Sequence, residues 1–156
     1  MAYELEFFSL TDKPALVAVS TLEWQARVLG VLDSMGYKIH VAQNHQDFIN
    51  RFTQFMYQIV VIEELFDCTK PEENQALQFV QNLPMNMRRH AVIILLSDRF
   101  TTMSPMHAFA QSVHAVIASS EFNMLEPLFQ RVINDNNLFL APFRQASEQV
   151  AQSRSE

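Results

Sequence analysis

Cysteine and glycine are both scarce in this sequence, which has one cysteine and two glycines among 156 residues. A single thiol cannot form an internal disulfide and is too little for a zinc site, so Cys68 is interpreted as a structural thiol. An average chain contains roughly 7% glycine. The low content argues against the glycine-rich loops that bind phosphate groups, and no cofactor is expected.

Positive charge and long apolar runs are scarce as well. Eleven Lys and Arg stand against 17 Asp and Glu, and the formal net charge of −6 disfavours binding to nucleic acid. No apolar run approaches 18 residues, and the first ten residues carry acids where an export signal carries basic residues. The five histidines show no metal-ligand spacing. We therefore expect a cytoplasmic protein with no membrane segment and no metal.

Short apolar runs are the main feature that the sequence does contain. Four of them lack polar alternation, which is typical of strands buried on both faces of a parallel sheet; they are residues 15–19, 59–62, 91–96 and 115–118. A fifth segment, 37–42, alternates apolar and polar residues, as an edge strand does. Helical patterns follow each run. This order predicts an α/β fold with a doubly wound, five-stranded parallel sheet.

Helix starts can be read between the strands. Residues 20–23 have the spacing of a capping box, and Asn44 can cap a second helix. Pro71 is suited to the first turn of a third. Ser104 and the proline after it can open a fourth helix, whose inner face is predicted to hold Met106, Phe109, Ala110 and Val113. A fifth is predicted to turn Leu125, Leu128, Phe129, Val132 and Ile133 inward.

The two ends of the chain extend beyond this pattern. Residues 1–14 are predicted to form an arm or an extra strand, and residues 15–137 one domain. Residues 138–156 are predicted to form a helical extension with a frayed end, in which Pro142 lets the helix begin afresh. Its apolar residues recur at helical spacing: Phe139, Phe143, Ala146 and Val150. Such a stripe must be covered by the domain itself, by a second copy or by another protein.

Polar residues stand at the carboxyl ends of the strands, where sites form in doubly wound sheets. They are Ser20, Thr21, Glu63, Ser97 and Ser119. When the chain is compared at these strand ends, positions 15–134 resemble the receiver domain of response regulators. The resemblance implies a flavodoxin-like sheet of strand order 2-1-3-4-5, with a phosphorylation pocket at the carboxyl edge.

The pocket departs from the receiver pattern at most positions. A working receiver has two acids where Ser20 and Thr21 stand, an acceptor aspartate at Glu63 and a lysine at Ser119, whereas Ser97 matches the switch position. Without the acids a magnesium ion lacks carboxylate ligands, and without the lysine the phosphoryl charge is not neutralised. The sequence thus predicts a degenerate phosphorylation pocket with no catalytic residue.

Three roles remain open for Glu63. As a carboxylate at a strand end, it can be solvated and bonded to backbone amides. It can also project toward Ser97 and stand in for phosphoaspartate. Alternatively, it can attract a divalent ion weakly, together with Glu64 and Asp98.

A closer resemblance rests on three runs, LPMNMRR at 83–89, LLSDRFTTM at 95–103 and AFAQSV at 108–113. They look like a receiver-like domain that follows an N-terminal zinc ribbon in certain bacteria. The LFL and PF runs near 138–143 fit its C-terminal extension. The chain has no CxxC pair, so the ribbon is expected to be either absent or removed from this sequence.

The leading functional prediction is a pseudo-receiver, a module without enzymatic activity that binds proteins in bacterial signalling. Its partner is an unidentified protein or a second copy, which would form a homodimer. A degenerate phosphoryl-accepting switch and a small-ligand-binding flavodoxin-like domain are the alternatives. The predicted interaction face comprises Met103, Met106, Phe109, Phe122, Phe139 and Phe143.

Overall fold

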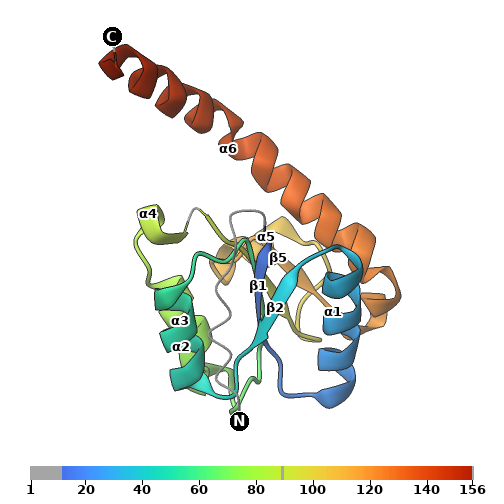
Figure 1. Ribbon diagram of the computed structural model, residues 1–156. Coiled ribbons are helices and arrows are strands. Elements are labelled where there is room, and N and C mark those ends of the chain that lie inside the picture. The colour runs from blue at the N-terminus through green and yellow to red at the C-terminus, as the bar shows by residue number, and fades with distance from the viewer. Residues whose placement is uncertain (1–11, 89, 156) are drawn as a thin grey trace.

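Five parallel strands form the centre of the fold (Figure 1). The computed structural model describes residues 12–88 and 90–155. The strands are β1 (Pro14–Ala18), β2 (Lys38–Val41), β3 (Ile59–Glu63), β4 (Val92–Leu96) and β5 (Ala115–Ile117). They lie in the order β2-β1-β3-β4-β5, and every neighbouring pair is parallel. The flavodoxin-like fold and the strand order are confirmed, with β2 at an edge.

The predicted N-terminal arm falls mostly outside the described residues. Of positions 1–14, the structure describes only 12–14, and Pro14 already belongs to β1.

Helices cover both faces of the sheet, with α1 and α6 on one side and α2 and α3 on the other (Figure 1). Their bounds are α1 (Leu22–Ser34), α2 (His45–Gln54), α3 (Gln75–Gln81), α4 (Met85–Arg88), α5 (Pro105–Ala110) and α6 (Leu125–Ser155). Two 3₁₀ turns, η1 (Pro71–Glu73) and η2 (Ser119–Met124), precede α3 and α6.

Two apolar cores form because successive strand residues point to opposite faces. Val60 and Ile93 face α2 and α3, where they join Phe48. Their neighbours in the strands face α1 and α6 instead, where Phe129 packs. Complete burial of a large apolar side chain contributes about 1.5–3 kcal/mol, so these two layers fix the sheet and both helix pairs.

Two helix starts differ from the prediction. Thr21 is the N-cap of α1 but makes no capping bond with its side chain, so the capping box over 20–23 is wrong. The third helix starts at Gln75 rather than at Pro71, which lies in η1. The reason is Asn74, whose Oδ1 accepts the N–H of Leu77 at 3.0 Å. A side-chain acceptor at this position satisfies an amide that has no partner within the helix.

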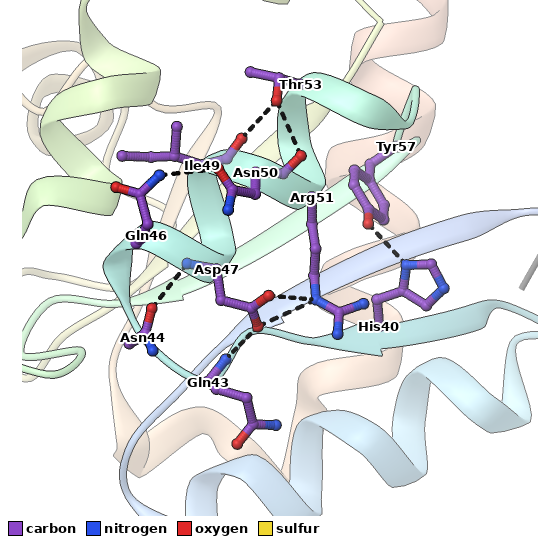
Figure 2. Close-up of polar contacts among 10 residues, drawn as sticks. All are labelled: His40, Gln43, Asn44, Gln46, Asp47, Ile49, Asn50, Arg51, Thr53 and Tyr57. Atoms are coloured by element: carbon purple, nitrogen blue, oxygen red, sulfur yellow. Dashed lines mark hydrogen bonds and ion pairs between the residues drawn. The ribbon is translucent and has the colours of Figure 1, made fainter. Parts of the chain in front are cut away.

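Figure 2 shows the start of α2 and the neighbouring edge of the sheet. Asn44 Oδ1 accepts the N–H of Asp47 at 2.8 Å, which confirms Asn44 as the N-cap. Asp47 in turn accepts Arg51 Nε–H, with N–O distances of 3.1 and 3.2 Å. Nearby, His40 Nδ1 and Tyr57 Oη form a buried hydrogen bond of 2.8 Å. The edge strand β2 is thereby tied to the residues that lead into β3.

The last helix, α6, is continuous over 31 residues. Leu125, Phe129 and Val132 are buried against the sheet and Leu128 and Ile133 partly so, as predicted. The predicted restart at Pro142 is wrong, and the helix runs through the expected boundary at 137/138. Proline removes the bond to the carbonyl of Leu138 and crowds that carbonyl, but Leu138 lies in an exposed part of the helix, where water can bind the carbonyl.

The C-terminal half of α6 projects beyond the rest of the fold (Figure 1). Although α6 is long, neither it nor any other helix within residues 12–88 and 90–155 is apolar enough to cross a membrane.

Candidate functional site

The carboxyl ends of β1, β3, β4 and β5 meet at one edge of the sheet and carry the candidate residues. Glu63 ends β3 and Glu64 follows it, and each is only 4% exposed. Among the side chains that the structure describes, every buried nitrogen and oxygen has a hydrogen-bond partner. The role of each acid at this edge can therefore be read from its partners.

Glu63 turns toward the beginning of α1. Its Oε2 accepts the N–H of Ser20 at 3.2 Å, and both carboxylate oxygens lie 3.3 Å from the backbone nitrogen of Thr21. Thr21 is the N-cap of α1, so the negative charge lies at the positive end of the helix dipole. Glu63 therefore binds, from another strand, the N–H of the N-cap residue, which is one of the amides without a partner inside the helix.

The same loop is held from its other side by Ser20. Its hydroxyl accepts the N–H of Asp67 at 2.8 Å. Asp67 has a φ of 49°, in the left-handed region, which aspartate tolerates better than most residues. The structure thus brings Ser20, Thr21 and Glu63 together. Of the three roles left open for Glu63, bonding to backbone amides is the one observed, although the carboxylate is buried rather than solvated.

Ser97 is bonded to Glu64, not to Glu63. Its hydroxyl donates to Glu64 Oε1 at 2.9 Å. Arg99 binds the same carboxylate in a bidentate manner, with Nε 2.8 Å from Oε1 and Nη2 2.7 Å from Oε2. Paired bonds of this kind are among the stronger ones in proteins. The hypothesis that Glu63 projects toward Ser97 is therefore wrong.

Sequence reasoning named Glu64 only as a possible weak ion ligand, and it missed both the Ser97–Glu64 hydrogen bond and the role of Arg99. A signal was available, because two consecutive acids at the end of a strand tend to point in different directions and so to find different partners. Arg99 gave no such signal, since it lies in a loop whose path the sequence does not define.

Ser119 forms a second, separate pair. Asp98 Oδ1 accepts the N–H of Ser119 at 2.7 Å, and Asp98 Oδ2 accepts its hydroxyl at 2.9 Å. Ser119, which was predicted to stand at the lysine position of a receiver, is thus bound to a carboxylate through its hydroxyl. Within the described residues no three His, Cys, Asp or Glu side chains are placed to hold a metal ion, so Glu63, Glu64 and Asp98 form no common ion site.

A fully buried side chain, Asn74, supports the end of β3. Its Nδ2 donates to the carbonyl oxygens of Glu63 and Glu64, both at 3.0 Å, while its Oδ1 caps α3. The side-chain amide of Asn74 therefore holds the backbone of both acids and caps the following helix. Nothing in the sequence pattern singled out this residue.

The predicted interaction face is only partly a surface. Met106 and Phe109 are 80% and 87% exposed, so their assignment to the inner face of α5 is wrong and they do lie on the surface. In this six-residue helix Ala108 faces the sheet instead, because its small side chain lets the helix lie close. Of the two other residues predicted on that inner face, Ala110 is exposed and Val113 is buried.

The remaining residues of that face lie in different environments. Phe122 is 7% exposed and packs edge-on against Trp24, with ring centroids 5.1 Å apart, so its surface assignment is wrong. Met103 is partly buried against the core, and Phe139 is 70% exposed on α6. The side chain of Phe143 lies outside the described part of the structure.

No protein-family model and no curated protein sequence matches the chain. Solved structures do match it. The receiver domain of the sensor histidine kinase PA1611 from Pseudomonas aeruginosa is 15% identical with a TM-score of 0.60, over 79% of this chain and 98% of that one. That receiver coordinates a magnesium ion in its active-site cleft.

Two response regulators give similar matches. The chemotaxis response regulator CheY4 of Vibrio cholerae is 14% identical with a TM-score of 0.62, over 78% of this chain and 99% of that one. The orphan response regulator HP1043 of H. pylori is 18% identical with a TM-score of 0.57, over 77% and 95%. The chain therefore has the receiver fold. The closer resemblance to zinc-ribbon proteins has no counterpart among these matches and stays a prediction.

Proposed function

We propose that this receiver-fold domain is a pseudo-receiver, which binds other proteins in cytoplasmic bacterial signalling and neither accepts nor hydrolyses a phosphoryl group. One observation carries the proposal: the polar groups at the pocket positions are already bound to one another. Glu63 caps α1, Ser97 is held by Glu64, and Ser119 is held by Asp98.

The arrangement opposes phosphoryl transfer at its first step. The acceptor must present a carboxylate oxygen to the phosphorus atom, but both oxygens of Glu63 face backbone amides of the loop before α1. Turning Glu63 outward would leave these amides without their acceptor, at a cost of about 1 kcal/mol or more. Magnesium would in addition need carboxylate ligands that Ser20 and Thr21 do not provide.

Charge neutralisation is the second obstacle. Phosphoryl transfer spreads negative charge over the phosphoryl oxygens, which a nearby cation must stabilise. Arg99 is a cation at this edge, but its guanidinium is committed to both oxygens of Glu64. A phosphoryl group would have to compete with an ion pair in which Glu64 is buried.

The test is direct phosphorylation of the full chain. The protein is incubated with magnesium and acetyl phosphate or phosphoramidate, and its intact mass is measured. We expect no mass gain, while a working receiver domain treated in parallel gains one phosphoryl group. A stoichiometric, acid-labile gain on this chain would overturn the proposal in favour of a phosphoryl-accepting switch.

A further inference from the structure

The apolar stripe of α6 does not end where the domain ends. Leu125, Phe129 and Val132 are buried against the sheet. The same alternation of four and three residues then continues through Asn136, Phe139, Phe143, Ala146 and Val150. At about 100° per residue, all eight positions fall within an arc of about 100°. The helix face that packs on the domain is thus continued along the projecting half.

Exposure on this projecting half distinguishes it from the buried half. Phe139 and Val150 are 70% and 50% exposed. At its base, Phe139 and Leu140 line an apolar depression of about 300 Å³ together with Met85 and Met103 of the domain. Packing on the same domain, one of the three arrangements expected from the sequence, therefore leaves most of Phe139 and half of Val150 exposed.

We propose that a second copy of this chain covers the stripe, and that the two α6 helices pack in antiparallel orientation over residues 136–153. The proposal names a partner for the protein-binding module put forward above. It rests on α6 and not on the pocket, so phosphorylation of the chain would overturn the proposed function and leave this inference intact.

The pattern of large and small residues favours a copy of the same helix. Apolar residues with alternating spacings of three and four form the seam of a coiled coil. If the helices run antiparallel, Phe139 stands opposite Val150 of the second copy, and Phe143 opposite its Ala146. Each large side chain then meets a smaller one, as tight packing requires. Positions 136 and 153 stand opposite each other at both ends of the pair, and Asn136 also hydrogen-bonds His114 of its own domain.

The position of the domain selects the antiparallel orientation. The domain occupies the stripe face of α6 at Leu125, Phe129 and Val132. In a parallel pair, both domains would lie on the seam side at the same end and would compete for the same space. In an antiparallel pair they lie at opposite ends, and the end of each helix approaches the depression beside Met85 and Met103 of the other copy.

The buried area is sufficient for a reversible dimer. A phenylalanine buries about 150–200 Å². Because Phe139 and Val150 are already partly covered, the stripe residues of both copies remove less than about 1,000 Å² in total, which is the size of a weak or transient interface. We expect dissociation in the micromolar range.

Analytical ultracentrifugation of the full chain between about 1 and 300 μM tests the proposal. We expect a shift from monomer to dimer. Phe139→Gln with Val150→Gln should raise the dissociation constant at least tenfold. Leu138→Gln is the matched control, because Leu138 is 74% exposed but lies on the opposite side of the same helix. Circular dichroism verifies that all variants fold. A chain that stays monomeric, or a control that weakens association equally, overturns the proposal.

Cysteine crosslinking tests the orientation, in a Cys68→Ser background. In antiparallel helices, chains with Asn136→Cys should crosslink to chains with Ser153→Cys, and neither variant should crosslink to itself. Rapid crosslinking of Ser153→Cys to itself would show parallel helices and overturn the proposed arrangement.

Discussion

The carboxylate of Glu63 lies 3.2 Å from the backbone nitrogen of Ser20, 43 residues earlier in the chain. A side chain from β3 thus performs the task that a capping residue usually performs locally. Glu63, which the sequence predicts at the phosphoacceptor position of a receiver, is thus part of the structure that holds β1, β3 and α1 together.

This relationship predicts that Glu63 contributes to stability. Glu63→Gln keeps an acceptor oxygen but removes the charge at the positive end of α1, and Glu63→Ala removes the acceptors as well. We expect the free energy of unfolding to fall by about 1 kcal/mol and about 2 kcal/mol, respectively. Urea denaturation measures both. Glu23→Gln is the control, because Glu23 is an exposed acid in the first turn of the same helix. The interpretation fails if Glu63→Gln costs no more than this control.

The two asparagine caps allow a matched comparison. Asn44 is exposed and forms one capping bond, whereas Asn74 is fully buried and forms three hydrogen bonds. We expect Asn44→Ala to cost about 1 kcal/mol and Asn74→Ala about 3 kcal/mol, since two buried carbonyls also lose their donor. Equal costs in chemical denaturation would contradict the role given to Asn74.

The sequence was sufficient for the sheet, because apolar strands and helical patterns alternate along the whole chain. It was not sufficient for the pocket. The partner of Glu63 is set by how closely β3 and the loop before α1 approach in space, which no local pattern encodes. The continuity of α6 was missed because Pro142 normally ends a helix, whereas here it removes one bond in an exposed region.

Two phenylalanines of the predicted interaction face should respond differently to truncation. Phe109 is 87% exposed, so Phe109→Ala should change the free energy of unfolding by less than about 0.5 kcal/mol. Phe122 is buried against Trp24, and Phe122→Ala should cost about 3 kcal/mol or more. Thermal and urea unfolding distinguish the two. A large loss for Phe109→Ala would mean that α5 packs against the domain through that ring.

His114 predicts a loss of stability at acidic pH. The residue reaches the surface, but its Nδ1 accepts the N–H of Ile93 at 2.9 Å. Removal of water from the ring, together with the charge of Arg88, lowers the pKa of His114 to about 4. Between the ordinary value of about 6.5 and this one, the unfolded chain binds a proton that the folded chain does not. Stability should therefore fall as the pH decreases from 6.5 to 4.

A substitution isolates this contribution. His114→Asn provides an oxygen acceptor for Ile93 that does not titrate in this range, so the variant should lose less stability between pH 6.5 and 4 than the wild type. His90→Asn, at an exposed position, serves as the control. Identical pH profiles for wild type and His114→Asn would exclude His114 as the source of the acid sensitivity.

The last prediction concerns the restoration of phosphorylation. Glu63→Asp alone should not make the chain a phosphoacceptor, because the groups that stabilise the transferred charge act as a unit. The shorter carboxylate would also lose its bonds to Ser20 and Thr21, so the variant should be less stable than the wild type. Acids at positions 20 and 21 and a lysine at 119 should be required in addition. This lysine would take the place of the Ser119 hydroxyl beside Asp98, and the acids would supply ligands for magnesium.

The variant with Glu63→Asp alone and the variant with all four substitutions are compared by intact mass after treatment with acetyl phosphate and magnesium, with folding verified by circular dichroism. Phosphorylation of the single variant would mean that other residues of this edge already hold the metal ion.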